Sequence, residues 1–85
     1  MKLRTDGISW QELDGELVIL DLATSKYLTT NRTGAFLAKL LTEERSASDL
    51  EKALIAEYGI DTALAARSVE AFVTALAEKG LLATA

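Results

Sequence analysis

The pattern of apolar and polar residues changes about a third of the way along the chain. Residues 8–13 and 16–22 are rich in β-formers and partly alternate, as strands do. Asp14-Gly15 lies between them and suits a two-residue hairpin, because both central positions of that turn need positive φ. Residues 23–25 predict a second turn, and residues 26–30 predict a third short strand. The simplest arrangement is an antiparallel meander with the second strand in the middle.

The second predicted strand is apolar on both faces. Val18, Leu20 and Leu22 should point one way, and Leu17 and Ile19 the other, because successive side chains of a strand alternate. This pattern is typical of a central strand that is covered on at least one face.

Three helices are predicted to follow the strands. Asn31 is a good N-cap for a helix over about 33–41. Ser46 and Asp49 approximate a capping box for the second helix, which Gly59 should end. Asp61 should cap the third helix, and Gly80 should end it. The predicted apolar stripes are Phe36, Leu37, Leu40 and Leu41 in the first helix, Leu50, Ala53, Leu54 and Tyr58 in the second, and Ala65, Val69, Phe72, Val73 and Leu76 in the third.

This order of elements predicts an α+β fold. A three-stranded antiparallel sheet followed by three helices, the last two joined by a tight turn, is winged helix-turn-helix-like. A chain of 85 residues suffices for one domain, so residues 1–85 are expected to form a single unit. Leu81-Leu82 should close against the core.

The composition argues against catalysis and metal binding. The chain has no cysteine and no histidine, so thiolate nucleophiles, disulfides and the commonest general base and metal ligand are all missing. The candidate paired carboxylates lie in turns or at strand ends, where a solvated surface explains them. They are Glu12, Asp14 and Glu16 around the hairpin, and Glu43 with Glu44. No serine lies in a nucleophile turn, and the five glycines are too scattered to cradle a phosphate. We therefore expect no catalytic residue, no metal and no cofactor.

The N-terminus, the apolar runs and the charge of the chain limit its expected location and partners. The N-terminus shows no secretory signal, and the longest apolar run, over residues 17–20, is far too short for a membrane span. A cytoplasmic protein that does not act at a membrane is therefore expected. The formal net charge of −4 is a poor start for nucleic-acid binding, which draws on Lys and Arg.

The third strand is the best candidate for a functional surface. Tyr27-Leu28-Thr29-Thr30 is uncharged and lies between Lys26 and Arg32, whereas free sheet edges are usually blunted by charge or proline. An open edge can accept an extended peptide as an added strand. Ordinary packing of Tyr27 and Leu28 within a short strand would explain the same residues.

The third helix offers a second wall. Ser68, Ala71 and Ala75 lie beside its apolar stripe, and such small residues would let another backbone come close. Alanine is also the best helix former and needs no functional reason.

The sequence resembles the PqqD-like family in two blocks. One is Gly15-Glu-Leu-Val-Ile-Leu-Asp-Leu-Ala-Thr-Ser-Lys-Tyr-Leu-Thr-Thr-Asn-Arg-Thr-Gly-Ala35. The other runs from Ser46 and Leu50 through Ala-Glu-Tyr-Gly-Ile-Asp61 to Gly80-Leu81-Leu82. The chain departs from the usual family pattern at Thr30, where leucine is common, and at Ser68, where an acidic residue is common. The segment over residues 31–35 and the stand-alone length look most like the lasso-peptide branch.

The resemblance implies a recognition element for the leader of a ribosomally made precursor peptide. Such elements bind the leader as an extra strand between the third strand and the third helix. In the lasso-peptide branch, the implied further partners are a cysteine protease that acts as leader peptidase and an ATP-dependent cyclase. With this likeness, the expected peptide-binding residues are Lys26, Tyr27, Leu28, Thr29 and Thr30 on the strand, and Arg67, Ser68, Ala71 and Phe72 on the helix.

Two other functions remain open from the sequence. The chain could be a recognition or chaperone subunit for a radical SAM enzyme in PQQ-type or other modified-peptide biosynthesis, as the resemblance also allows. It could instead be a winged-helix DNA-binding protein that reads with its third helix. That helix has only Arg67 and Lys79 as cations, and it also carries Glu70 and Glu78, which phosphates would repel.

Overall fold

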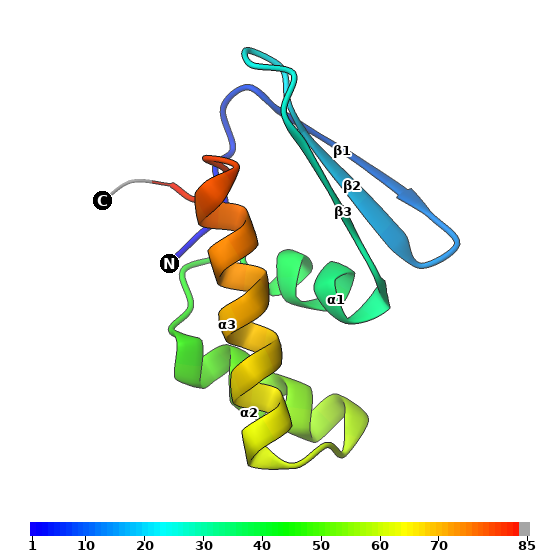
Figure 1. The fold of residues 1–85 in the computed structure, drawn as a ribbon, viewed down its shortest axis with the longest axis vertical. Coiled ribbons are helices and arrows are strands. Elements are labelled where there is room, and N and C mark those ends of the chain that lie inside the picture. Colours follow the sequence, from blue (N-terminus) through cyan, green and yellow to red (C-terminus); the bar gives the residue numbers. More distant parts are fainter. Residues whose placement is uncertain (84–85) are drawn as a thin grey trace.

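The computed structural model describes residues 1–83 and confirms the α+β fold, with a three-stranded antiparallel sheet followed by three helices (Figure 1). All three helices lie to one side of the sheet; α1 follows directly from the lower end of β3, and α3 stands on the other side of α1 in this view. The elements are β1 (Ile8–Leu13), β2 (Glu16–Asp21), β3 (Tyr27–Thr30), α1 (Arg32–Leu40), α2 (Ala47–Tyr58) and α3 (Thr62–Glu78).

The sheet is the predicted meander, in the order β1-β2-β3. Asp14 and Gly15 have φ values of 53° and 83°, so the β1–β2 turn has the backbone that Asp-Gly favours. On the other side, β2 pairs with β3 in a register that places Leu17 opposite Thr30 and Leu20 opposite Tyr27. β2 is therefore central, and β1 and β3 are the two edges of the sheet.

The predicted caps begin each helix where the sequence places them. The Asn31 side chain accepts the Gly34 N–H, and Ser46 and Asp49 form the full capping box. Asp61 accepts the Leu64 N–H at the start of α3. Each cap satisfies an amide that the first helical turn leaves free, so these polar residues set the helix boundaries locally.

The core lies between one face of the sheet and the helices. Leu17 and Ile19 project from β2 into it, whereas Val18 and Leu20 on the other face are only half-buried. The buried helical side chains that meet them are Ala35, Leu37, Ala38, Leu50, Leu54, Ala65, Val69 and Leu76, with Leu41 just beyond α1. Phe36 and Phe72 from the predicted stripes are only half-buried, and the Phe36 ring meets Tyr58 edge-on at 5.6 Å.

The N-terminal segment contributes to the core in a way that periodicity does not reveal. Leu3 is buried and forms an isolated antiparallel bridge with Leu82, so both ends of the described chain close the same side. Arg4 Nη1 lies 2.9 Å from Asp21 Oδ2 and also donates to the Gly80 carbonyl. Asp21, at the end of β2, is thus a buried carboxylate that ties the sheet to the two chain ends.

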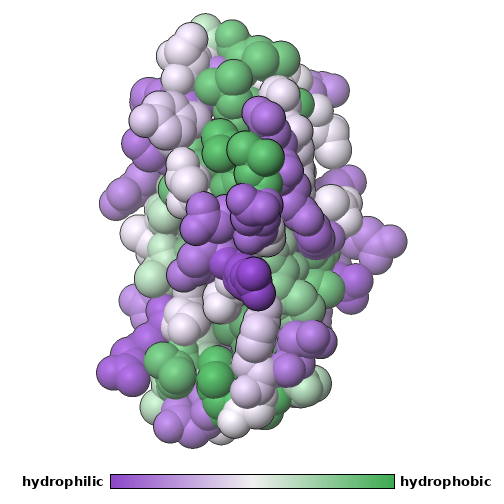
Figure 2. Space-filling model, turned by 90° about the vertical axis from the view of Figure 1, so that its right-hand side faces the viewer, coloured by the Kyte–Doolittle hydropathy of each residue, from purple (hydrophilic) through white to green (hydrophobic). Residues whose placement is uncertain are grey.

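The face of the sheet opposite the helices is left uncovered by the described chain. Leu13, Leu22 and Tyr27 are the large apolar residues most exposed there, at 63%, 61% and 60%. Figure 2 shows hydrophobic side chains gathered toward the upper end of the molecule, above a band of hydrophilic ones. Apolar side chains thus remain on a surface that the fold itself does not need to bury.

The protein should become less stable as the pH falls, because Asp21 becomes protonated. The Ala23 N–H, Arg4 and the Thr24 N–H together hold the pKa of Asp21 below its usual 3.8, although burial opposes them. A depressed folded-state pKa means that the stabilisation is present above the unfolded pKa and is lost as pH falls through the folded one. Asp21→Asn should therefore melt at a lower temperature than wild type at pH 7, and the gap should narrow below about pH 4. Thermal melts followed by circular dichroism, with Asp6→Asn as exposed control, test this; a gap independent of pH would contradict it.

Candidate peptide-binding groove

The outer edge of β3 presents free backbone groups at alternate residues. Asp21 N–H donates to the Lys26 carbonyl at 2.8 Å, which marks Asp21 and Lys26 as a hydrogen-bonded pair. Because hydrogen-bonded and non-hydrogen-bonded pairs alternate in an antiparallel ladder, Leu28 and Thr30 turn their N–H and C=O groups toward β2. Tyr27 and Thr29 therefore direct their N–H and C=O groups away from the sheet, toward the position that an added strand would take.

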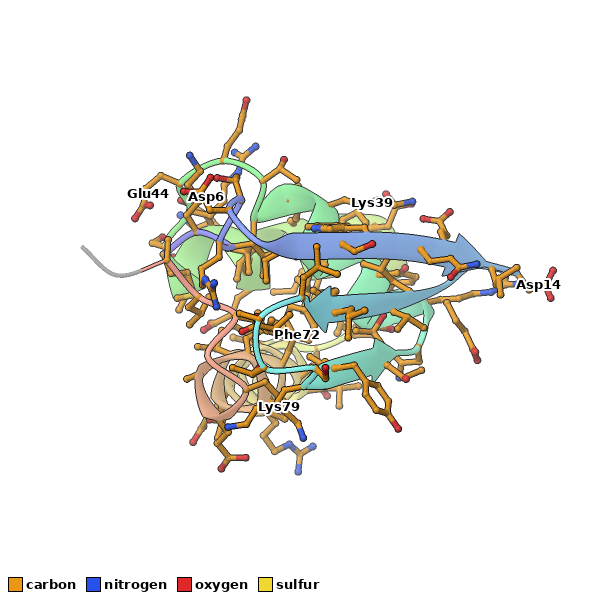
Figure 3. The ribbon with its side chains drawn as sticks, turned by 90° about the horizontal axis from the view of Figure 1, so that it is seen from above. Asp6, Asp14, Lys39, Glu44, Phe72 and Lys79 are labelled. Carbon is orange, nitrogen blue, oxygen red and sulfur yellow. The ribbon has the colours of Figure 1, made fainter. Side chains whose placement is uncertain are left out.

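A groove runs along this edge between β3 and α3. Its volume is about 400 Å³, within the range of roughly 300–1,000 Å³ typical of ligand clefts. Seen from above, Phe72 lies on the side of α3 that faces the sheet, far from Asp14 at the tip of the β1–β2 hairpin (Figure 3). The lining residues are Leu28, Thr29, Thr30, Asn31, Thr33, Gly34, Leu37, Ser68, Ala71, Phe72 and Ala75.

The floor of the groove is the first turn of α1, where close packing requires glycine. A Cβ built on Gly34 would lie 2.8 Å from Thr30 Cβ and 3.4 Å from Phe72 Cε1. Gly34 therefore lets α1 approach both walls while leaving open space above it. The buried Thr30 hydroxyl donates to the Leu17 carbonyl at 3.3 Å, so its polar group is satisfied beside the floor of the groove.

The far wall is formed by α3, which presents mostly small side chains there, beside Phe72. Its buried stripe of Ala65, Val69 and Leu76 faces the core, and Ser68, Ala71 and Ala75 face the groove one step around the helix. Short side chains leave room for a peptide backbone between a helix and a strand. The lining carries no charged residue; Arg67, Glu70 and Glu78 lie on the outer rim, beside Ala71 and Ala75.

The groove brings together most of the residues that the sequence singled out. Leu28, Thr29, Thr30, Ser68, Ala71 and Phe72 all line it. Lys26 lies just before β3, which begins at Tyr27, one residue later than predicted. Both are exposed and lie outside the lining, and Arg67 lies on the rim beside α3.

Sequence reasoning missed the contribution of α1. Asn31, Thr33, Gly34 and Leu37 line the groove, yet they were interpreted only as a cap and as helix or core residues. Glycine in the first turn of a helix, where it disfavours helix formation, is the one signal that could have pointed to a close approach there.

The charged groups with displaced pKa values belong to structural contacts. Asp21, whose pKa is lowered, links the sheet to Arg4. The pKa of Asp49 is lowered mainly by the hydrogen bond from the Ser46 N–H, which is part of the capping box. Neither carboxylate lines the groove. Within residues 1–83 no cluster of acidic side chains is arranged to hold a metal ion, and no helix there has the length and apolar character to cross a bilayer. The groove therefore offers shape and backbone hydrogen bonds.

A profile match over the elements that build this groove identifies the family of the chain. The profile of the family described as Coenzyme PQQ synthesis protein D (PqqD) matches residues 16–82, from the start of β2 to the residue that pairs with Leu3. The chain belongs to the PqqD family. The match spans β3, α1 and α3, so every residue that lines the groove falls within the matched region.

Two solved structures resemble the chain over nearly its whole length. TbiB1 in complex with the TbiA(beta) leader peptide is 32% identical, with a TM-score of 0.85, covering 100% of this chain and 98% of that one. Lasso peptide synthetase B1 complexed with the leader peptide is also 32% identical, with a TM-score of 0.78 and coverages of 94% and 93%. A search of curated protein sequences finds no match.

Gly34→Ala tests how tightly the floor is packed. Alanine in an exposed helix would stabilise the protein by about 1 kcal/mol over glycine. Here the new methyl group would overlap the side chain of Thr30, so we expect a net loss of about 1–3 kcal/mol in the free energy of unfolding. Urea unfolding measures it. A variant more stable than wild type would show that α1 and β3 are less closely packed than the structure has them.

Proposed function

We propose that this protein is a leader-peptide recognition element of lasso-peptide biosynthesis, which binds the leader of a precursor peptide as a fourth strand beside β3. The observation that carries the proposal is the uncharged edge of β3, with Tyr27 and Thr29 directing their backbone groups outward beside an open groove. Main-chain hydrogen bonds would supply affinity, and the groove would supply selectivity. Both similar solved structures are described as bound to leader peptides, which supports the proposal.

The two edges of the sheet differ in a way that favours β3. The β1 edge carries Glu12, which pairs with Lys39 of α1 at 2.6 Å. Charge on an edge strand discourages the addition of another chain. The four residues of β3 carry no charge, and α3 stands opposite them with small side chains. A guest strand at β3 would thus satisfy backbone groups and fill the groove at once.

The protein would act by binding alone and would hand the precursor to enzymes. We propose that these partners are a leader peptidase of the cysteine-protease class and an ATP-dependent cyclase, and that the protein acts in the cytoplasm. The full chain, residues 1–85, would serve as one recognition domain; residues 84–85 lie outside the described residues. No catalytic residue and no cofactor is assigned to it.

The alternative functions gain less support. DNA reading by α3 would bring Glu70 and Glu78, on the rim beside the groove, close to phosphates. A role beside a radical SAM enzyme would use the same groove, but one of the two similar structures is of a lasso peptide synthetase B1, and both hold a leader peptide.

A nuclear magnetic resonance titration tests the proposed function. Addition of the TbiA(beta) leader peptide to ¹⁵N-labelled protein should shift the amide signals of β3 and of the α3 residues that line the groove. Peptides selected from a displayed random library serve as a second probe, because a leader from a 32%-identical relative need not be recognised. If neither the TbiA(beta) leader nor any selected peptide moves the β3 amides, the proposal is wrong.

Proline at Thr29 should weaken peptide binding without breaking the sheet. Thr29 directs its N–H away from β2, so Thr29→Pro removes a donor that only the guest strand would use. We expect roughly a five- to tenfold loss of affinity, as for one hydrogen bond. Glu12→Pro places the same ring at an outward amide of the opposite edge and should leave affinity unchanged. Fluorescence anisotropy with labelled peptide measures both; equal effects at the two edges would contradict the assignment of β3.

A large side chain at Ala71 should fill the groove. Ala71 is exposed on α3 and lines the groove, so Ala71→Phe would occupy the space left for the peptide. We expect at least a tenfold loss of affinity, because the guest strand could no longer lie beside α3. Ala56→Phe, at an exposed alanine of α2 outside the groove, is the matched control. Isothermal titration calorimetry decides between them; unchanged affinity for Ala71→Phe would place the peptide elsewhere.

A further inference from the structure

The face of the sheet that points away from the helices continues the proposed peptide site. Tyr27 is the residue where this face meets the β3 edge, and it is 60% exposed although it lies in a strand. We propose, on the basis of the proposed function, that the bound peptide is read on both faces of the enlarged sheet, and that Tyr27 selects an apolar peptide side chain on the outer face.

The pleat of β3 divides its side chains between two surfaces. Leu28 and Thr30 lie opposite Ile19 and Leu17 and share the core side with them, where the groove is. Tyr27 and Thr29 lie opposite Leu20 and Val18 and project to the outer face. A peptide added beside β3 must follow the same alternation, so half of its side chains cannot enter the groove.

The residues that a guest strand would meet on the outer face are apolar or uncharged. Tyr27 faces Leu20 as a non-hydrogen-bonded pair, in which side chains approach most closely, and Thr29 faces Val18 in the same way. Val18 and Leu20 are half-buried without any helix above them. A charged peptide side chain would be partly desolvated here without an ionic partner, whereas an apolar one would extend the existing apolar row.

The backbone geometry brings one peptide residue directly beside Tyr27. Since Tyr27 turns its N–H and C=O outward, the guest residue opposite it would be hydrogen-bonded to it and would place its Cβ about 5 Å from that of Tyr27. The phenol ring would then lie between Leu20 on one side and the guest side chain on the other.

A pattern in the peptide follows from this placement. Its groove residues, opposite Leu28 and Thr30, are two positions apart and apolar. The residue opposite Tyr27 lies at an odd separation from both and is also selected to be apolar. If recognition took place only in the groove, every second peptide residue would be selected and the residues between them would be free to vary.

Tyr27 and Leu13 make a matched pair for the test. Both are large, exposed side chains on the outer face, at 60% and 63%, but Leu13 lies on β1, two strands away from the proposed guest. Threonine keeps strand propensity at either position. Tyr27→Thr should therefore change peptide preference, and Leu13→Thr should not.

The experiment selects binders from a displayed library of random 16-residue peptides against wild type, Tyr27→Thr and Leu13→Thr. Wild-type binders should show apolar residues at the two groove positions and at the position of opposite parity facing Tyr27. Binders of Tyr27→Thr should keep the groove positions and lose the third preference. For one wild-type binder, Tyr27→Thr should lower affinity about fivefold, the upper end for a cross-strand pair, and this loss should vanish when the facing peptide residue is threonine.

The outcomes separate the two proposals. Binders that shift the β3 amides but show one-parity selection, identical for wild type and Tyr27→Thr, would overturn the role of Tyr27 and leave leader binding intact. A similar loss for Leu13→Thr would also overturn it, because the effect would not be local to the β3 edge. A library without binders at β3 would instead overturn the proposed function itself.

Discussion

A strand at the edge of a sheet must leave half of its backbone groups without partners in the sheet, and the arrangement of this protein depends on how β3 is treated. β2 satisfies Leu28 and Thr30, but Tyr27 and Thr29 direct their N–H and C=O groups outward. On that side, α3 lies across the groove from β3 and lines the groove mostly with small side chains. The proposed binding of a guest strand depends on these unpaired backbone groups of β3.

The scaffold around the edge is built to keep the groove open. Gly34 brings α1 against Thr30 and Phe72, so the floor is set by close contact. At the other side of the molecule, Leu3 pairs with Leu82, and Arg4 links Asp21 to the end of α3 through the Gly80 carbonyl. Walls that are fixed before binding reduce the ordering cost that a guest peptide must overcome.

The parts of the structure that depend on local chemistry could be predicted from the sequence. The Asp14-Gly15 turn, the Asn31, Ser46 and Asp61 caps and the alternation of β2 each act within a few residues, and the structure has them as expected. The buried role of Leu3 and Asp21 could not be predicted, because it depends on contacts between segments about 17 to 79 residues apart. The groove floor was missed for the same reason, since Gly34 gains its meaning only from Thr30 and Phe72.

The two faces of the sheet have different roles: the inner face stabilises the fold, and the outer face is free to take part in recognition. Leu17 and Ile19 on the inner face pack against the helices, so truncating them would destabilise the domain. Val18, Leu20 and Tyr27 on the outer face hold no helix, and the groove opens on the inner side of the β3 edge. A guest strand would join both surfaces at once, because its alternate side chains reach the groove and the outer face. Selectivity can then vary at Tyr27 without cost to the core, whereas changes at buried groove residues such as Leu37 would disturb the core.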